Sequence, residues 1–216
     1  MKTYAIVPVK HLDASKRRLT SVLKPEDRRA LTLAMLEDVL NAIKGSLVQE
    51  TVVVGNDLCV SGLAANAGVL YKEEKRRGLN RAITGSIEWC LKREVDAIVV
   101  LPADIPLISS IDINRIIEIA RNSGPILVLS PSEDGGTNAL YMRPPNLIPV
   151  NYGPGSFKKH IKQSRAKGAR LKVYYSHSIA FDIDTQQDLQ KLSRTSNVTV
   201  STQLAAKISR NLHCRQ

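Results

Sequence analysis

The chain has 216 residues, 43% of them hydrophobic, and a formal net charge of +11. This length suits one domain with a full-size core; no apolar run reaches the roughly 18 residues of a membrane span, and the apolar N-terminal stretch is too short for a signal peptide, so we expect a cytoplasmic protein. The charge favours anionic partners, although an aromatic content of only 4% argues against a stacking surface for single-stranded nucleic acid.

Short β-like runs alternate with longer amphipathic stretches along the chain. Several of the runs are continuous Val, Ile and Leu, which is typical of strands covered on both faces. The predicted strands are Tyr4–Val9, Thr51–Val54, Val69–Tyr71, Ala97–Leu101, Ile126–Leu129, Ala139–Met142 and Leu171–Tyr175. The predicted helices are Pro25–Ile43, a segment with Leu79, Ala82, Ile83, Ser86 and Cys90 on one face, Ile113–Ala120, Ser156–Lys167, and a last one containing Gln187–Leu192.

This alternation predicts a single α/β domain over residues 1–192 with a mostly parallel sheet. The polar and basic stretch 193–216 is an extension that forms either a terminal helix or a tail. Ligands of such domains gather beyond the carboxyl ends of the strands, so residues that directly follow predicted strands are the first candidates for a site.

The segment LPADIPLI places a carboxylate, Asp104, just past a predicted central strand. Pro106 keeps Ile105 extended and delays the next helix. A carboxylate held there is either a ligand of a hard metal ion, a residue of a ribose or phosphate site, or an aspartate that satisfies the backbone amides of a turn.

The segment FDIDT holds a second acidic pair, Asp182 and Asp184. Along a strand these two side chains fall on the same face, where their mutual repulsion favours a cation. Magnesium uses one or two carboxylates together with phosphate oxygens of the substrate. Helix capping by Asp184 or Thr185 is the alternative, and it accounts for one carboxylate better than for both.

Four cations lie within nine positions of the loop after the first strand: Lys10, Lys16, Arg17 and Arg18. Such residues can hold a triphosphate and neutralise the charge of a departing phosphate group, or they can simply form a solvated basic loop. The glycine-rich motifs GxxxxGK[ST] and GxGxxG are missing from the sequence.

Two segments of small residues, EDGGTNAL and YGPGSF, could present backbone amides and hydroxyls to an anion, or could be ordinary glycine turns. Ser156 would also cap the helix that follows it. The four histidines are scattered and form no HExxH motif, so the sequence favours neither a histidine metal site nor a Ser/His/Asp triad.

The ordered segments IVPVK, SKRRL, GLNRAI, LPADIPL, GGTNAL, YGPGSF and FDIDT together resemble the 2-phospho-L-lactate guanylyltransferase family, from about residue 4 to residue 192. That family looks like a branch of the GT-A-type nucleotidyltransferases, so the resemblance implies a three-layer Rossmann-like fold with a mostly parallel mixed sheet. It implies a reaction that joins GTP to 2-phospho-L-lactate and releases pyrophosphate, in coenzyme F-420 biosynthesis. Some relatives are thought to use phosphoenolpyruvate or 3-phosphoglycerate.

The resemblance also implies roles for matching positions. Asp104, Asp182 and Asp184 would hold Mg2+, and Lys16, Arg18 and Asp104 would be catalytic. The nucleotide would contact the basic first loop and the segment near the guanine base, at Lys10, Gly78, Leu79 and Asn80. The phosphoacid would bind at Thr137, Gly153 and Ser156. The first loop of classical relatives is rich in glycine, whereas here it is basic and lacks glycine.

Three other readings stay open. Another cofactor or sugar nucleotidyltransferase, such as a molybdenum-cofactor guanylyltransferase, would share the acidic residues but not GGTNAL and GPGSF. A non-catalytic anion or nucleic-acid binder would use the positive charge and leave the three aspartates unexplained. A regulatory nucleotide-binding protein could share the fold without the activity. We expect small-molecule partners, no nucleic acid and no membrane, and the family resemblance suggests a homodimer.

Overall fold

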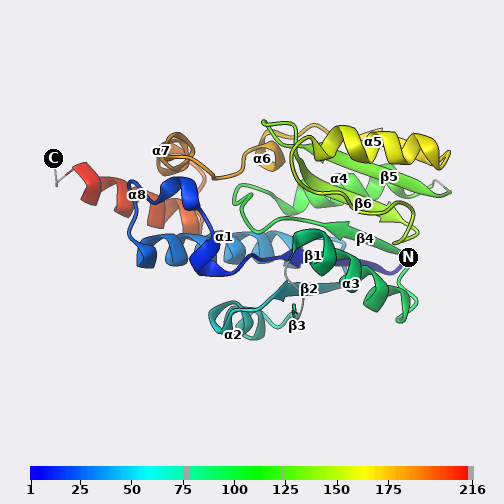
Figure 1. The fold of residues 1–216 in the computed structure, drawn as a ribbon, viewed down its shortest axis with the longest axis horizontal. Helices are drawn as coiled ribbons and strands as arrows, with labels where there is room; N and C mark the ends of the chain where they lie inside the picture. The colour runs from blue at the N-terminus through cyan, green and yellow to red at the C-terminus, as the bar shows by residue number, and fades with distance from the viewer. Residues whose placement is uncertain (75–77, 123, 214–216) are drawn as a thin grey trace.

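The computed structural model describes residues 1–74, 78–122 and 124–213 (Figure 1). Within these ranges, seven strands form one sheet in the order β3-β2-β1-β4-β6-β5-β7. Their bounds are β1 Thr3–Pro8, β2 Glu50–Gly55, β3 Leu70–Glu73, β4 Ala97–Val100, β5 Ile126–Pro131, β6 Thr137–Arg143 and β7 Arg170–Val173. Strand β6 runs antiparallel to β4 and β5, and the other neighbouring pairs are parallel. The predicted strands and the mixed, mostly parallel sheet are confirmed.

The helices are α1 Pro25–Lys44, α2 Leu58–Asn66, α3 Leu79–Leu91, α4 Ser110–Ala120, α5 Ser156–Ala166, α6 His177–Ala180, α7 Gln186–Arg194 and α8 Val200–His213. Two short 3-10 helices, η1 Leu12–Ala14 and η2 Arg17–Leu19, interrupt the basic loop. The sequence did not predict α2, which begins at the N-cap Asp57, whose carboxylate accepts a hydrogen bond from Cys59 N at 2.9 Å. No helix in the described ranges has the length and apolar character needed to cross a bilayer.

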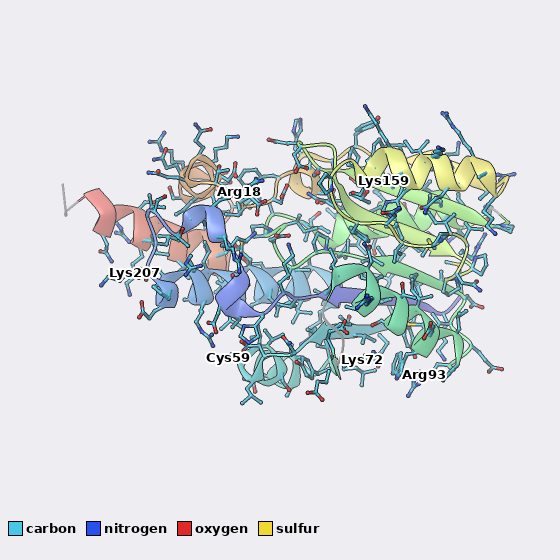
Figure 2. The ribbon with its side chains drawn as sticks, in the orientation of Figure 1. Arg18, Cys59, Lys72, Arg93, Lys159 and Lys207 are labelled. Carbon is cyan, nitrogen blue, oxygen red and sulfur yellow. The ribbon has the colours of Figure 1, made fainter. Side chains whose placement is uncertain are left out.

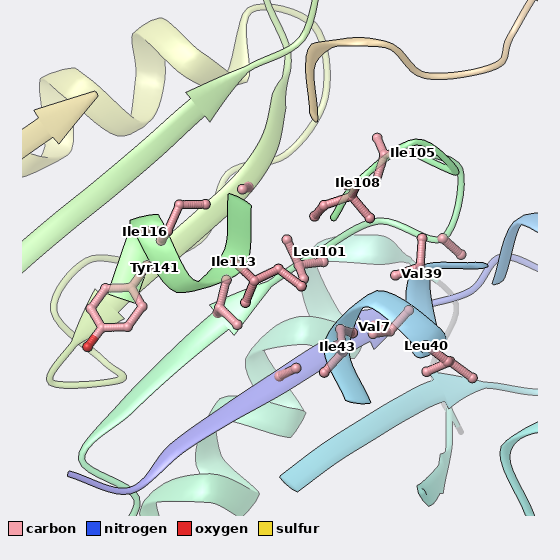
Figure 3. Packing of buried hydrophobic residues seen from close by; sticks show 14 of the residues in the cluster. Val7, Val39, Leu40, Ile43, Leu101, Ile105, Ile108, Ile113, Ile116 and Tyr141 are labelled. Carbon is pink, nitrogen blue, oxygen red and sulfur yellow. The ribbon is translucent and has the colours of Figure 1, made fainter. Parts of the chain in front are cut away.

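The central strands are apolar throughout because helices cover both faces of the sheet. Along β1, Ala5 and Val7 face the layer that contains α1, α2 and α4, and Ile6 faces the layer that contains α3 and α5. Figure 3 shows the first layer, where side chains of α1 and α4 meet those of β1 and of Leu101, the residue after β4. The fold therefore has three layers, and its two cores lie on opposite faces of one sheet.

A third apolar cluster lies beyond the sheet and holds the first loop in place. Leu19 and Leu23 of that loop pack with α1, with Phe181 and Ile183, and with α7 and α8. Figure 1 shows α7, α8 and the start of α1 together at the end of the molecule away from the N-terminus. Asp38 of α1 accepts hydrogen bonds from the first backbone amides of α8, Val200 N and Ser201 N, at 2.9 Å each. Residues 200–213 are thus a packed helix.

Candidate active site

A cavity of about 480 Å³ lies beyond the carboxyl ends of β1 and β4. Its walls come from the first loop, the segment after β4, the turn between β5 and β6, and the loop before α5. The predicted site residues that line it are Lys10, Lys16, Arg18, Leu79, Asp104, Thr137, Gly153, Ser156, Asp182 and Asp184. Folding therefore brings together in one cavity residues that lie as far apart in the chain as Lys10 and Asp184.

Lys16 lies between two of the predicted carboxylates. Its Nζ donates to Asp104 Oδ2 at 2.7 Å and to Asp184 Oδ1 at 3.2 Å. The Lys16 side chain is only 4% exposed, whereas those of Asp104 and Asp184 are 33% and 42% exposed. Burial alone would lower the pKa of Lys16, but the two carboxylates outweigh it and raise the pKa above its ordinary value. Burial would raise the pKa of Asp104, yet Lys16 holds it below its usual range.

The backbone of the first loop turns Lys16 inward. Lys16 has φ 51° and ψ 41°, in the left-handed region that side chains other than glycine seldom adopt. On one side, the Ser15 hydroxyl is hydrogen-bonded to Leu12 O at 2.6 Å and paired with the Thr32 hydroxyl at 3.0 Å. On the other side, Leu19 is fully buried in the third cluster. These contacts hold the strained residue and fix its ammonium group over the acidic residues.

The segment that carries Asp182 and Asp184 is extended but is not a strand, so the predicted strand geometry there was wrong. The alternation survives, because Phe181 and Ile183 are buried and the two aspartates are partly exposed at the cavity. One hydrogen bond, from Ile183 N to Asp104 O at 3.2 Å, joins this segment to the loop after β4. It brings the two acidic segments into the same wall.

Unlike Asp104 and Asp184, Asp182 makes no hydrogen bond to Lys16 among its described contacts. Asn138 Nδ2 donates to Asp182 Oδ1 at 3.3 Å and to Ile179 O at 2.8 Å. Burial, and then the charge of Asp104, raise the pKa of Asp182 to about 6. Sequence reasoning missed Asn138, although it directly follows Thr137 in GGTNAL and is a buried amide just before the apolar middle of β6.

Hydroxyl groups form the wall that faces the carboxylates. Ser156 Oγ donates to Thr137 Oγ1 at 3.2 Å, and both residues are almost fully buried. Ser156 N donates to Gly153 O at 3.0 Å, which closes the turn before α5. Gly153 has φ 125°, a conformation that strains any other residue, so the backbone of this turn favours glycine. The predicted set Thr137, Gly153 and Ser156 therefore forms one contiguous surface.

The turn between β5 and β6 closes the cavity beside this wall. Asp134 accepts hydrogen bonds from the Ser132 hydroxyl and from Gly136 N, and the Ser132 contact keeps the pKa of Asp134 below its ordinary value. A Cβ atom at Gly136 would lie 2.6 Å from Ser132 Oγ, so any other residue there would displace this hydroxyl from Asp134. This explains the glycine that precedes Thr137.

The predicted nucleotide-binding residues separate into two groups. Gly78 and Leu79 line a neighbouring cavity of about 580 Å³ that also contacts Lys10 and continues from the first through shared residues. Asn80 lines neither cavity, because its side-chain amide is hydrogen-bonded to the backbone of Tyr152 in both directions, at 3.1 Å and 2.7 Å. Asn80 thus joins the start of α3 to the loop before α5.

Three cations of the first loop, Lys10, Arg17 and Arg18, remain accessible at the mouth of the cavity. Lys10 is exposed and lines both cavities. Arg18 has a side chain that is 71% exposed, and its Nη1 lies 3.7 Å from Asp184 Oδ2. Figure 2 shows Arg18 on the first loop, on the side where α7 lies. These side chains can move toward an incoming anion with little loss of buried contact.

Solved structures identify the fold. A nucleotidyl transferase from Methanothermobacter thermautotrophicus has a TM-score of 0.68 at 16% identity, over 97% of this chain and 99% of that one. A cytidylyltransferase from Leptospira borgpetersenii has a TM-score of 0.62 at 16% identity, over 98% of this chain and 95% of that one. At these identities the likeness establishes the fold, and it is the α/β fold of the nucleotidyltransferases.

Sequence comparison identifies the family. The family described as Guanylyl transferase CofC like matches residues 3–214. A phosphoenolpyruvate guanylyltransferase from Rubrobacter xylanophilus is 38% identical over 199 residues, which are 92% of this chain and 97% of that protein. A 2-phospho-L-lactate guanylyltransferase from Methanothermobacter thermautotrophicus is 34% identical over 193 residues, 89% of this chain and 84% of that protein. This chain belongs to the CofC-like guanylyl transferase family, and the predicted enzyme class is confirmed.

Proposed function

We propose that this enzyme transfers a guanylyl group from GTP to the phosphate of a small phosphoacid, either 2-phospho-L-lactate or phosphoenolpyruvate, and releases pyrophosphate. The product would be a diphosphoguanosine adduct that serves coenzyme F-420 biosynthesis. The observation that carries the proposal is the cavity itself, where cations, carboxylates and a hydroxyl wall meet at the carboxyl ends of β1 and β4. The names of the two relatives support both acids.

The reaction is an in-line displacement at the α-phosphorus of GTP. An oxygen of the phosphoacid's phosphate attacks this phosphorus, the bond to the β-phosphate bridging oxygen breaks, and pyrophosphate leaves with that electron pair. A phosphate monoester is already ionised near neutral pH, so the attack requires no strong general base. This agrees with a cavity whose described lining contains no histidine.

Each wall of the cavity then has a role in this reaction. Thr137, Ser156 and the backbone at Gly153 hold the phosphoacid. Lys16 and Arg18 neutralise negative charge on the triphosphate and on the departing pyrophosphate. The buried Lys16 ammonium acts where water is largely excluded, and the exposed Arg18 guanidinium can move onto phosphate oxygens at the mouth of the cavity. Leu79 and Gly78, at the neighbouring cavity, receive the base. Positioning and charge neutralisation supply most of the catalysis in such transfers.

Magnesium fits the acidic wall. In the ranges the structure describes, no three His, Cys, Asp or Glu residues meet as a ready cluster of metal ligands. Mg2+ requires only one or two carboxylates, with water and phosphate oxygens completing its shell. Asp104 and Asp184 already share one cation, the Lys16 ammonium, and the raised pKa of Asp182 marks a place where added positive charge is favourable. Asp104, with Asp182 or Asp184, would hold Mg2+, which would draw charge from the α-phosphate.

A pyrophosphate-release assay tests the proposal. The purified chain is mixed with each of 2-phospho-L-lactate, phosphoenolpyruvate and 3-phosphoglycerate against GTP, ATP and CTP, with Mg2+ and with EDTA. We expect release with GTP, with one of the first two acids, and only in the presence of Mg2+. Release with a molybdopterin acceptor but with no phosphoacid, or binding of nucleic acid without any turnover, would contradict it. The homodimer stays a prediction, which sedimentation equilibrium can test.

A further inference from the structure

His160 lies behind the hydroxyl wall and is completely buried. Its Nε2 accepts a hydrogen bond from Asn151 N at 2.9 Å, and its Nδ1 lies 3.0 Å from Thr137 Oγ1. The ring of Tyr152 meets the imidazole edge-on, with centroids 5.3 Å apart. His160 does not itself line the cavity, so any effect on a ligand passes through its neighbours.

The contact with Asn151 fixes the tautomer of this imidazole. A backbone N–H can only donate, so Nε2 must carry its lone pair and no proton. Burial, with a smaller contribution from Lys159, lowers the pKa of His160 to about 4, so the ring is neutral near pH 7. A neutral imidazole without a proton on Nε2 has its proton on Nδ1. Nδ1–H therefore donates to Thr137 Oγ1.

The direction of the Thr137 hydroxyl follows from this. Its oxygen accepts from His160 Nδ1 and from Ser156 Oγ, which uses both lone pairs. The hydroxyl hydrogen of Thr137 is the only part of this group that is not yet in a described hydrogen bond, and Thr137 lines the cavity. With both acceptor positions occupied, this hydroxyl can act toward a ligand only as a donor.

We propose that His160 is a positioning residue, which holds the Thr137 hydroxyl as an obligate hydrogen-bond donor to an anionic oxygen of the phosphoacid. This inference rests on the proposed function and adds a selection rule to it. The ligand atom that faces Thr137 must be an acceptor, a carboxylate or phosphate oxygen, and a hydroxyl in donor orientation is rejected there. The same imidazole also holds the loop that leads from Asn151 to Gly153.

Two variants separate the contacts of His160. The amide nitrogen of asparagine takes the place of Nδ1, so His160→Asn keeps the donor to Thr137 and loses the acceptor for Asn151. Glutamine places its amide oxygen near the position of Nε2, so His160→Gln keeps that acceptor and loses the donor to Thr137. Calorimetry in Mg2+ with 2-phospho-L-lactate and phosphoenolpyruvate measures the Kd of whichever acid binds more tightly.

We expect His160→Gln to weaken acid binding by roughly tenfold or more, the usual effect of one hydrogen bond to a charged group. His160→Asn should stay within about threefold, and the KM for GTP should hold in both. In a Thr137→Val background, His160→Gln should have no further effect. Equal losses in the two variants, a greater loss in His160→Asn, or additive effects with Thr137→Val would overturn the proposal.

A matched control separates positioning from stability. Ser164 lies one turn further along α5, is equally buried, and donates to Ala169 O at 3.3 Å, away from the cavity. Ser164→Ala should lower the free energy of unfolding and leave the acid Kd unchanged. A change in Kd equal to that of His160→Gln would assign the effect to general destabilisation and overturn the proposal.

A spectroscopic measurement needs no variant and no turnover. In ¹⁵N-labelled wild-type protein, we expect the His160 ring to show a proton on Nδ1 and a bare Nε2. A proton on Nε2 would overturn the inference even if the variants failed to fold. Because calorimetry detects binding without turnover, a chain that binds an acid but releases no pyrophosphate would contradict the proposed function alone.

Discussion

Replacing Asp112 by asparagine tests how the segment that carries Asp182 and Asp184 is held in place. Asp112 Oδ2 accepts from Ser109 N at 3.0 Å, Ser109 Oγ at 2.6 Å and Ser178 Oγ at 2.8 Å. Oδ1 accepts from Ser176 Oγ at 2.7 Å and Tyr174 OH at 3.1 Å. One carboxylate thus caps α4 and anchors the chain around α6, just before Asp182.

The geometry gives the size of the effect. The asparagine amide has one oxygen and one NH2 group. The oxygen must take the Oδ2 position, because an NH2 group at that position would face the N–H of Ser109, and two donors would then meet. The NH2 group then takes the Oδ1 position, and the hydroxyls of Ser176 and Tyr174 lose a charged acceptor. At about 1 kcal/mol for each hydrogen bond, and somewhat more for the lost charge, Asp112→Asn should lower the free energy of unfolding by about 2–3 kcal/mol.

The pH dependence distinguishes this explanation from a simple packing defect. Burial would raise the pKa of Asp112, but the hydrogen bonds, led by that of Ser109, hold it below its ordinary value of 3.8. A carboxylate with a lowered folded pKa contributes stability above its unfolded pKa, and loses it as the pH falls through the folded pKa. Asparagine does not titrate. The stability difference between wild type and variant should therefore be largest at pH 6–7 and shrink below about pH 4.

Urea unfolding monitored by circular dichroism at pH 7, 4 and 3 measures the difference, and Ser193→Ala, which removes an exposed hydroxyl on α7, is the matched control. A difference that stayed constant as the pH fell would refute the linkage argument. A difference below 0.5 kcal/mol at pH 7 would show that the carboxylate charge and its two hydroxyl contacts at Oδ1 contribute little net stability.

Three further predictions concern the site. Asp104→Asn should lower pyrophosphate release by roughly a hundredfold or more with an unchanged circular dichroism spectrum, and near-normal turnover would contradict its assignment. Lys16→Met leaves two partly exposed carboxylates without their shared cation, so the free energy of unfolding in urea at pH 7 with EDTA should fall by about 1–3 kcal/mol; an equally stable variant would show that the ion pair contributes nothing net. Asn80→Ala removes both hydrogen bonds to the Tyr152 backbone and should lower the free energy of unfolding by about 1–2 kcal/mol while raising the KM for the phosphoacid; if both were unchanged, the Asn80 contact would have no role in the site.

The local hydrophobic pattern of the sequence was enough to predict the sheet and most of the helices that cover it. Continuous apolar runs mark strands buried on both faces, and the described sheet has every predicted strand. The same pattern failed for α2, whose small residues and Gly62 give a weak helical signal, and which is held by packing of Val60 and Ala64 against the sheet. It also failed at FDIDT, where alternation came from an extended loop instead of a strand.

A pattern in the sequence of α5 could have predicted that His160 is a buried part of the site. Ser156, His160 and Ser164 recur at every fourth position of α5, and all three are buried. A stripe of uncharged polar side chains on a helix with four basic residues at its other positions indicates a polar buried face. Such a face requires partners, because buried polar groups are costly unless they are hydrogen-bonded.

The sequence by itself determined the strands of the sheet and most of the helices, and that Asp104 directly follows a buried strand, because these depend on neighbours a few positions away. The tertiary structure alone decided which charges meet. Lys16 reaches Asp104 across 88 positions and Asp184 across 168, and such contacts depend on how the first loop packs against α7 and α8. Electrostatic pairing depends on distance in space, and distance along the chain gives no measure of it.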